Sequence, residues 1–230
     1  MSDPATDLKR QAAEAALEQL ESGMVVGLGT GSTAAFVISG LGARLAAGVL
    51  SDIRAVATSL ETEELARAAG IEIIGLEPAG VDIAIDGCDE VDPQLQLIKG
   101  LGGALTREKL VALAARRFVI VADDSKAVSQ LGEKAPVPVE VIPFGLSATV
   151  ARLELLGGSC RLRRGAGGQP VVSDNGNFMV DYTPAAGFSP LELAADLKAE
   201  TGVLEHGLFL ELADEAILAG PDGLRRLVRA

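Results

Sequence analysis

Short apolar runs alternate with amphipathic stretches over the first 125 residues. After Asp3-Pro4, apolar residues recur every three or four positions, which predicts a helix that Asp3 caps and Gly23 ends. The segment 81–85 instead alternates with a period of two, which is typical of a strand. The same reasoning predicts helices at 33–46, 62–69 and 104–116 and strands at 24–26, 53–57, 71–74 and 118–121. Strands separated by helices indicate a parallel sheet with helices on both faces.

The pattern changes near Pro136-Val137-Pro138-Val139, which indicates a domain boundary. Asn175-Gly176 between apolar runs predicts a hairpin in the second part. The predicted elements there are strands at 139–142 and 160–163, two strands around 174–177, a strand at 204–210, and helices at 147–156 and 190–200. This order suggests a ferredoxin-like α+β unit. After it, an apolar run at 215–218 and a short basic helix following Pro221 are expected to return to the first part.

The predicted fold class is therefore α/β. Residues 1–134 and 211–230 are expected to form a Rossmann-like domain with a doubly wound, mostly parallel sheet. Residues 135–210 are expected to form the smaller ferredoxin-like α+β domain.

Composition narrows the class of partner. The chain has 20 Lys and Arg against 32 Asp and Glu, a net charge of −12, which argues against nucleic acid or an anionic membrane as partner. Two cysteines, Cys88 and Cys160, form no disulfide framework and favour a reducing, cytoplasmic setting. No apolar run approaches the roughly 18 residues that a membrane span needs, and the N-terminus does not resemble a secretory signal.

A glycine-rich turn, Gly27-Leu28-Gly29-Thr30-Gly31-Ser32-Thr33, follows a predicted strand and opens a helix. Free amides at a helix N-terminus bind anions, and the hydroxyls of Thr30, Ser32 and Thr33 suit a phosphate or a polyol. The turn lacks the lysine of a P-loop, and Ser32 stands where a dinucleotide fingerprint has its third glycine. Alone, it could equally be a tight turn in which Ser or Thr caps the helix.

Acidic residues cluster after the strand at 81–85. Asp86 and Asp89 flank Gly87-Cys88, and two neighbouring carboxylates push their pKa values apart, which suits proton transfer. The alternatives are Asx turns that cap the loop, or a magnesium site that adds Asp92. No phosphoryl-transfer motif accompanies the latter, and no metal is expected.

The segment from Lys99 to Lys109 is the most informative one. Three glycines within four residues, Gly100, Gly102 and Gly103, let the backbone wrap a small ligand beside the Lys99 charge. Glu108 falls in the first turns of the next predicted helix, where the helix dipole favours an ionised carboxylate that can accept a proton. Without further context, these features would also suit a flexible loop, a solvated lysine and an ordinary early-helix glutamate.

Together these segments resemble the ribose-5-phosphate isomerase A family over nearly the whole chain. The matching blocks are GLGTGST (27–33), DIAIDGCDEVD (82–92), LIKGLGGALTREKL (97–110), VADDSKAV (121–128) and PVPVEVIPF (136–144). The resemblance implies interconversion of ribose 5-phosphate and ribulose 5-phosphate in the pentose phosphate pathway, without metal or cofactor. It also implies a homodimer, or a tetramer.

The resemblance implies a role for each matching residue. Glu108 would carry a proton between C1 and C2 through a cis-enediolate, Asp86 would help to open the furanose ring, and Lys99 would stabilise negative charge on oxygen. The sugar would lie against Asp86, Gly87, Cys88, Asp89, Lys99, Gly100, Leu101, Gly102 and Gly103. Its phosphate would be held by Thr30, Gly31, Ser32, Thr33, Lys126 and Lys9.

Two residues depart from the family pattern. Leu101 stands where a glycine is expected, so one amide contact should shift. Cys88 stands where the family often has alanine, and the two carboxylates beside it should raise its pKa, which makes it a packing residue and not a nucleophile.

Several other residues are given structural interpretations. His206, the only histidine, is expected to be structural or at an interface. A basic cluster is interpreted as a solvated strand face, and three aromatic residues as core or dimer contacts. These are Arg161, Arg163 and Arg164, and Phe178, Tyr182 and Phe209.

Two other functions compete with the isomerase. A sugar-phosphate sensor would not need Glu108 and Asp86, yet both are present. A sugar-phosphate hydrolase or deaminase usually recruits an active-site histidine, and His206 is poorly placed for that.

Overall fold

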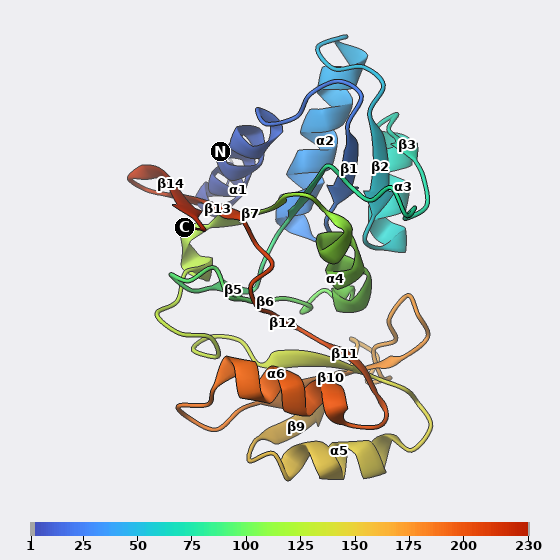
Figure 1. Ribbon diagram of the computed structural model, residues 1–230, viewed down its shortest axis with the longest axis vertical. Helices are drawn as coiled ribbons and strands as arrows, with labels where there is room; N and C mark the ends of the chain where they lie inside the picture. The colour runs from blue at the N-terminus through green and yellow to red at the C-terminus, as the bar shows by residue number, and fades with distance from the viewer. Residues whose placement is uncertain (1–2, 230) are drawn as a thin grey trace.

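The computed structural model describes residues 3–229 and contains three β-sheets (Figure 1). In the seven-stranded sheet the order is β14-β13-β7-β4-β1-β2-β3, and only the edge strand β14 runs antiparallel to its neighbour. The strands are β1 (Val25–Leu28), β2 (Arg54–Ala57), β3 (Glu72–Ile73), β4 (Ile83–Asp86), β7 (Phe118–Asp123), β13 (Glu215–Gly220) and β14 (Gly223–Val228). The chain runs outward from β1 through β2 to β3 and then returns to β4 on the other side of β1. A topological switch point, where α/β proteins bind ligands, therefore lies between β1 and β4.

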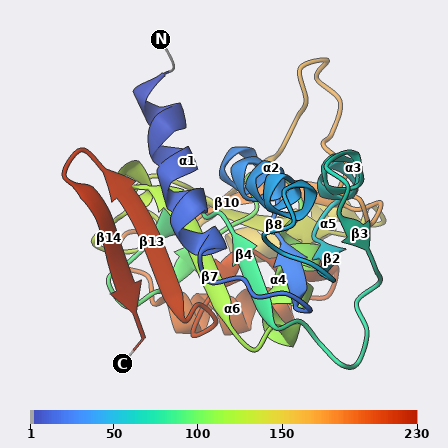
Figure 2. The same cartoon turned by 90° about the horizontal axis from the view of Figure 1, so that it is seen from above.

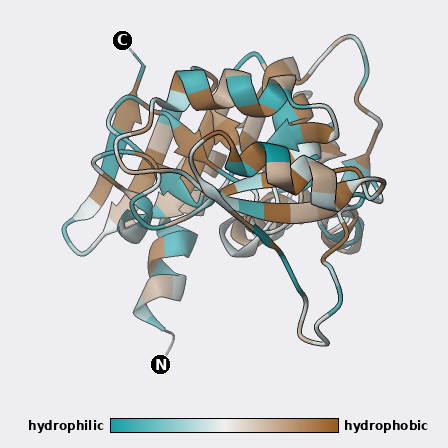
Figure 3. Ribbon diagram, turned by 90° about the horizontal axis from the view of Figure 1, so that it is seen from below, coloured by the Kyte–Doolittle hydropathy of each residue, from teal (hydrophilic) through white to brown (hydrophobic). Residues whose placement is uncertain are grey.

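Helices cover both faces of this sheet (Figure 2). They are α1 (Pro4–Leu17), α2 (Ser32–Ala46), α3 (Leu60–Ala68) and α4 (Leu105–Ala114). Ile83 and Ile85 pack with α1 and α2, whereas Ala84 between them packs with α4 on the opposite face. Burial on both faces explains why these strands are almost continuously apolar. The helices, unlike these apolar strands, carry both hydrophilic and hydrophobic residues (Figure 3).

The four-stranded sheet is antiparallel throughout and has the order β11-β8-β10-β9. Its elements are β8 (Val137–Val141), α5 (Leu146–Glu154), β9 (Ser159–Leu162), β10 (Phe178–Thr183), α6 (Pro190–Ala199) and β11 (Val203–His206). This is the ferredoxin-like arrangement that the sequence predicts. Leu153 of α5 and Leu197 of α6 share an apolar cluster with Val139 and Val180, so one face of the sheet is covered by both helices. We propose residues 135–210 as the smaller domain because they supply most of this cluster.

A three-stranded sheet, β12-β6-β5, is not predicted by the sequence. Its strands are β5 (Glu90–Val91), β6 (Leu97–Ile98) and β12 (Leu208–Phe209). Two residues per strand are too few to reveal a period of two. The predicted strand at 204–210 is in fact β11 and β12, separated at Gly207, because the chain leaves one sheet there and enters another.

Three further predictions differ from the structure. The basic C-terminal segment is the strand β14 and not a helix, because after Pro221 the chain turns at Gly223 (φ 105°) and pairs with β13. The strand before Asn175-Gly176 is reduced to isolated bridges, including one between Val172 and Phe178. Asp3 caps α1 as predicted, but α1 ends at Leu17, well before Gly23.

Among residues 3–229, no helix is long and apolar enough to cross a membrane.

Candidate functional site

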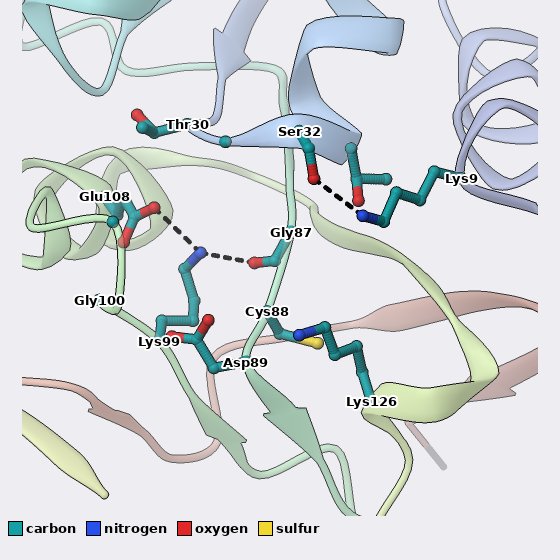
Figure 4. Close-up of a pocket in the computed structure, with 13 residues that line it drawn as sticks. Lys9, Thr30, Ser32, Gly87, Cys88, Asp89, Lys99, Gly100, Glu108 and Lys126 are labelled. Carbon is teal, nitrogen blue, oxygen red and sulfur yellow. Dashed lines mark hydrogen bonds and ion pairs between the residues drawn. The ribbon is translucent and has the colours of Figure 1, made fainter. Parts of the chain in front are cut away.

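A pocket lies at the carboxyl ends of β1 and β4, beside the switch point (Figure 4). It is lined by Lys9, Thr30, Gly31, Ser32, Thr33, Gly87, Cys88, Asp89, Lys99, Gly100, Gly102, Glu108 and Lys126. Each of them is a site residue predicted from the sequence. Of the remaining predicted residues, Asp86 is buried behind the pocket wall, and Leu101 and Gly103 belong to the turn that forms one side.

The turn between β1 and α2 packs directly against Asp86. A Cβ atom on Gly29 would lie 2.0 Å from Asp86 Oδ1, so only glycine fits there. The Thr30 amide donates to the same oxygen at 3.2 Å. Gly31, with φ 101°, then caps α2 and places the amides of the first helical turn at the pocket.

Three hydroxyls that are absent from the predicted site hold Thr30 in place. Thr30 Oγ1 lies 2.7 Å from Thr58 Oγ1, 2.9 Å from Ser59 Oγ and 3.1 Å from Thr62 Oγ1. Their only signal in the sequence is the Ser59-to-Thr62 spacing of a helix cap, and Ser59 does cap α3.

Two lysines bring positive charge to the mouth of the pocket. Lys9, on α1, donates to Ser32 Oγ at 3.1 Å. Lys126 ends the 3₁₀ helix η1 (Asp124–Lys126) after β7 and extends toward Cys88 (Figure 4). Together with the nearby α2 N-terminus, these lysines form a surface suited to an anion.

A buried charge cluster lies at the base of the pocket. Lys99 Nζ is 3.0 Å from Asp86 Oδ2 and 3.3 Å from Glu108 Oε1, and it donates to the Gly87 carbonyl oxygen at 2.5 Å. The exposed fractions of Asp86, Lys99 and Glu108 are only 2%, 2% and 5%. Within residues 3–229, Glu108 Oε2 has no hydrogen-bond partner.

Burial changes the proton affinity of both carboxyls. It raises the pKa of Glu108 to about 8, with Asp86 and Asp89 acting in the same direction and Lys99 against them. Burial also raises the pKa of Asp86, although Lys99 opposes it. The pKa of Lys99 is raised because the attraction of Asp86 and Glu108 outweighs the effect of burial. A lysine that stays charged beside a carboxylate of near-neutral pKa can serve proton transfer at a developing oxyanion.

The glycine turn closes the pocket opposite α2. Gly100 and Gly103 have φ values of 108° and 84°, and the Gly103 amide donates to the Gly100 carbonyl oxygen at 2.9 Å. The Leu101 amide donates to Asp89 Oδ2 at 2.9 Å, whereas its side chain is 42% exposed. A side chain at this position therefore leaves the pocket open.

The comparisons with known proteins point to one family. The family model for ribose 5-phosphate isomerase A (phosphoriboisomerase A) matches residues 54–223. The chain belongs to this family. It is 51% identical to ribose-5-phosphate isomerase A of Roseiflexus sp. (strain RS-1), over 95% of this chain and 94% of the relative. The corresponding protein of Thermococcus kodakarensis is 44% identical, over 97% and 98%.

Solved structures of isomerases show the same fold. A D-ribose-5-phosphate isomerase in complex with phospho-erythronic acid is 41% identical and superposes with a TM-score of 0.95, over 99% of this chain and 100% of that one. Ribose 5-phosphate isomerase A of Methanocaldococcus jannaschii is 39% identical with a TM-score of 0.92, over 96% and 98%. The ribose 5-phosphate isomerase A family thus accounts for both the large parallel sheet and the ferredoxin-like unit.

Cys88, a departure from the family pattern, lines the pocket as a thiol. Burial raises its pKa to about 12, and Asp89 and Asp86 add to that effect. The predicted cause of this shift was the two neighbouring carboxylates, but burial is the larger cause.

The magnesium alternative receives no support from Asp92. Asp92 Oδ1 accepts from the amides of Gln94 and Gln96, which is an Asx-type turn. No cluster of three metal-ligating side chains occurs among residues 3–229.

His206 lies outside the pocket lining and is 5% exposed. Burial and the neighbouring Lys109 lower its pKa to about 3, so it is neutral at physiological pH. Its Nδ1 accepts from the Leu208 amide at 3.3 Å, which agrees with a structural role.

The predictions for the basic cluster and the aromatic residues are confirmed only in part. Tyr182 and Phe209 belong to the core, and the Phe209 ring centroid lies 5.5 Å from Lys99 Nζ. Arg161 is solvated, with 82% of its side chain exposed. The prediction is wrong for Arg163, whose side chain is only 12% exposed and contacts the glycine turn.

Proposed function

We propose that this chain interconverts ribose 5-phosphate and ribulose 5-phosphate in the non-oxidative branch of the pentose phosphate pathway. The observation that carries the proposal is the pairing of Lys99 with Glu108, a carboxyl of near-neutral pKa that lines the pocket and keeps one oxygen unpartnered among the described residues. Family membership supports it, because the similar proteins carry this activity in their names. A sensor would not need such a carboxyl.

The proton transfer uses Glu108 as the base. Its carboxylate takes the proton from C2 of the open-chain aldose, the C2–H electrons form the C1–C2 double bond, and the C1 carbonyl oxygen becomes negatively charged. A proton then passes from O2 to O1, and Glu108 returns its own proton to C1 to give the ketose. The atoms and electrons of this reaction balance without a redox cofactor or a metal.

Lys99 and the glycine turn stabilise the cis-enediolate. Lys99 Nζ is fixed by Asp86 and Glu108, so its charge is in place before the oxyanion develops. The Gly100 and Gly102 backbones line the same pocket, and their amides have no acceptor among residues 3–229. We assign ring opening to Asp86 acting through Lys99, because Asp86 lies behind the pocket wall and contacts Lys99, which lines the pocket. We assign Asp89, which lines the pocket, to the sugar hydroxyls.

The phosphate end of the substrate fits the opposite side of the pocket. Its ligands would be the side chains and amides of Thr30, Gly31, Ser32 and Thr33, with charge from Lys9 and Lys126. The remaining predicted contacts, Gly87, Cys88, Leu101 and Gly103, would shape the wall around the sugar. We further propose a homodimer, or a tetramer, in the cytoplasm, as the family resemblance implies.

The test is the conversion of ribose 5-phosphate to the ketose by EDTA-treated protein, followed by absorbance. Glu108→Gln should lower kcat by about 10²–10⁴-fold because it removes the base. It should still bind the substrate, as measured by calorimetry. The matched control is Glu192→Gln, since Glu192 is also a first-turn helix glutamate but is exposed and outside this pocket. Wild-type protein that binds the sugar phosphate without forming ketose would favour the sensor, and an active Glu108→Gln variant would exclude Glu108 as the base.

A further inference from the structure

We propose that Arg163, which directly follows β9 of the four-stranded sheet, is a positioning residue that orients the peptide groups of the glycine turn 100–103 toward the substrate. The inference rests on the proposed isomerase function, in which this turn binds the developing oxyanion. It goes beyond that function because Arg163 neither lines the pocket nor belongs to the segments assigned to the substrate.

Arg163 binds the turn through two carbonyl groups. Its Nη1 donates to the Gly100 carbonyl oxygen at 2.9 Å and to the Leu101 carbonyl oxygen at 2.8 Å. The guanidinium has planar, fixed donors, so two contacts define its orientation better than one flexible ammonium could.

These two contacts determine where the neighbouring amides point. In a trans peptide the C=O and the N–H point in opposite directions. The Gly100 carbonyl is held by Arg163, and the amide of the same peptide group, on Leu101, does point away from it, to Asp89 Oδ2 at 2.9 Å. By the same geometry, holding the Leu101 carbonyl turns the Gly102 amide away from Arg163, and Gly102 lines the pocket.

A second residue holds Arg163 in this position. Asp181 on β10 accepts from Arg163 Nε at 3.1 Å and also from Nη2, and only 4% of Asp181 is exposed. The fork geometry of this ion pair leaves Nη1 for the turn. Because the turn contains three glycines, its own side chains restrain its backbone little. Contacts from a residue outside the turn, such as Arg163, are therefore needed to fix its conformation.

Arg161 provides a matched control. It lies two residues away, in β9, and its side chain also approaches Asp181, at 3.8 Å. Its side chain is 82% exposed, however, and it has no hydrogen bond to the glycine turn. Replacing either arginine removes one positive charge near Asp181, but only Arg163 contacts the turn.

The experiment compares Arg163→Gln, Arg163→Lys and Arg161→Gln with the wild type in two assays. Steady-state kinetics with ribose 5-phosphate should show kcat reduced about 10- to 100-fold in Arg163→Gln, with KM changed by less than about threefold, because the reacting groups are misplaced. Arg163→Lys should recover part of kcat, and Arg161→Gln should stay within about twofold of the wild type. Amide hydrogen exchange of peptides spanning 99–103 should be faster in Arg163→Gln and unchanged in Arg161→Gln.

The two assays separate this inference from the proposed function. Unchanged exchange in the turn of Arg163→Gln overturns the positioning role, whatever the activity. Faster exchange with a kcat equal to that of Arg161→Gln also overturns it. If the wild type forms no ketose, the proposed function fails, and the exchange data still decide whether Arg163 orders the turn. Should Arg163→Gln not fold, Arg163→Lys and Asp181→Asn give the same comparison.

Discussion

At the residue scale, the pKa of Glu108 depends on burial and on neighbouring charges that shift it in opposite directions. Burial raises its pKa to about 8, Asp86 and Asp89 raise it further, and Lys99 lowers it. A base of such a pKa is suited to accept and return a proton near neutral pH. A glutamate with an ordinary pKa of about 4.3 would be ionised but a weaker base.

The pH dependence follows from this balance. Glu108 acts in its ionised form, so kcat/KM should rise with pH, about tenfold per unit, up to an apparent pKa near 8. Asp89→Asn removes a negative charge that raises the Glu108 pKa and should move this limb to lower pH. Steady-state rates measured from pH 5 to pH 9.5 give the apparent pKa of the wild type and of Asp89→Asn, with Glu192→Gln as the control. The prediction would be contradicted if kcat/KM of the wild type stopped rising already below pH 6, where the substrate phosphate itself titrates.

At the scale of the elements, the junction between β11 and β12 determines where Lys99 lies. The Gly207 amide donates to the Pro138 carbonyl oxygen at 2.7 Å, and the Gly207 carbonyl accepts from the Lys99 amide at 2.9 Å. A Cβ atom on Gly207 would lie 2.0 Å from the Lys99 carbonyl oxygen and 2.9 Å from Pro138 Cδ. Three chain segments therefore meet at a position where only glycine fits.

Gly207→Ala should destabilise the protein and displace Lys99. We expect the free energy of unfolding to fall by roughly 1–3 kcal/mol, because the clash is with backbone atoms that cannot rotate away. We also expect a lower kcat in the protein that remains folded. In the control Gly75→Ala, the nearest atom to the new Cβ is Glu77 Oε1 at 3.8 Å, and the change should be within about 0.5 kcal/mol. Urea denaturation of both variants measures the difference, and equal midpoints would refute the argument.

At the scale of the whole molecule, a net charge of −12 must coexist with the binding of the dianionic sugar phosphate that we propose as the substrate. Charges farther away than about 10 Å are largely screened at 0.1 M salt, whereas those within the pocket are not. Lys99 is paired with Asp86 and Glu108 at the base of the pocket, whereas Lys9 and Lys126 bring positive charge to the phosphate end. The local charge at that end is therefore opposite in sign to the overall charge.

Lys126→Gln should therefore raise KM about tenfold at low ionic strength, with kcat within about threefold, because it removes charge at the phosphate end. The ratio of mutant to wild-type KM should shrink when salt is raised from about 20 mM to 0.5 M. Lys198→Gln on α6, outside the pocket lining, should leave KM unchanged. A KM ratio that does not depend on salt would show that Lys126 acts by shape and not by charge.

Much of this protein could be predicted from local sequence signals. The strand that ends in Asp86, the glycine turn after β1, and the helix that begins just before Glu108 each follow from periodicity and turn chemistry within about ten residues. Because parallel strands end at the same sheet edge, the sequence also placed Asp86 and the Gly29–Ser32 turn at that edge. The pairing of β1 with β4, which brings them into contact, is seen only in the tertiary structure. The ferredoxin-like order followed from the second half of the chain in the same way.

Tertiary structure alone decided the contacts between distant segments. The two-residue strands β5 and β12 form because each pairs with β6. In the same way, β14 forms because it pairs with β13. Arg163 carries no local sign that it contacts Gly100, 63 positions away, and in the sequence it cannot be told apart from solvated Arg161. The raised pKa of Glu108 likewise arises from burial, which no property of the early-helix glutamate itself reveals. The sequence determined which groups the site contains, whereas packing determined their charge states and which of them are held in place, because desolvation and long-range contacts depend on the whole fold.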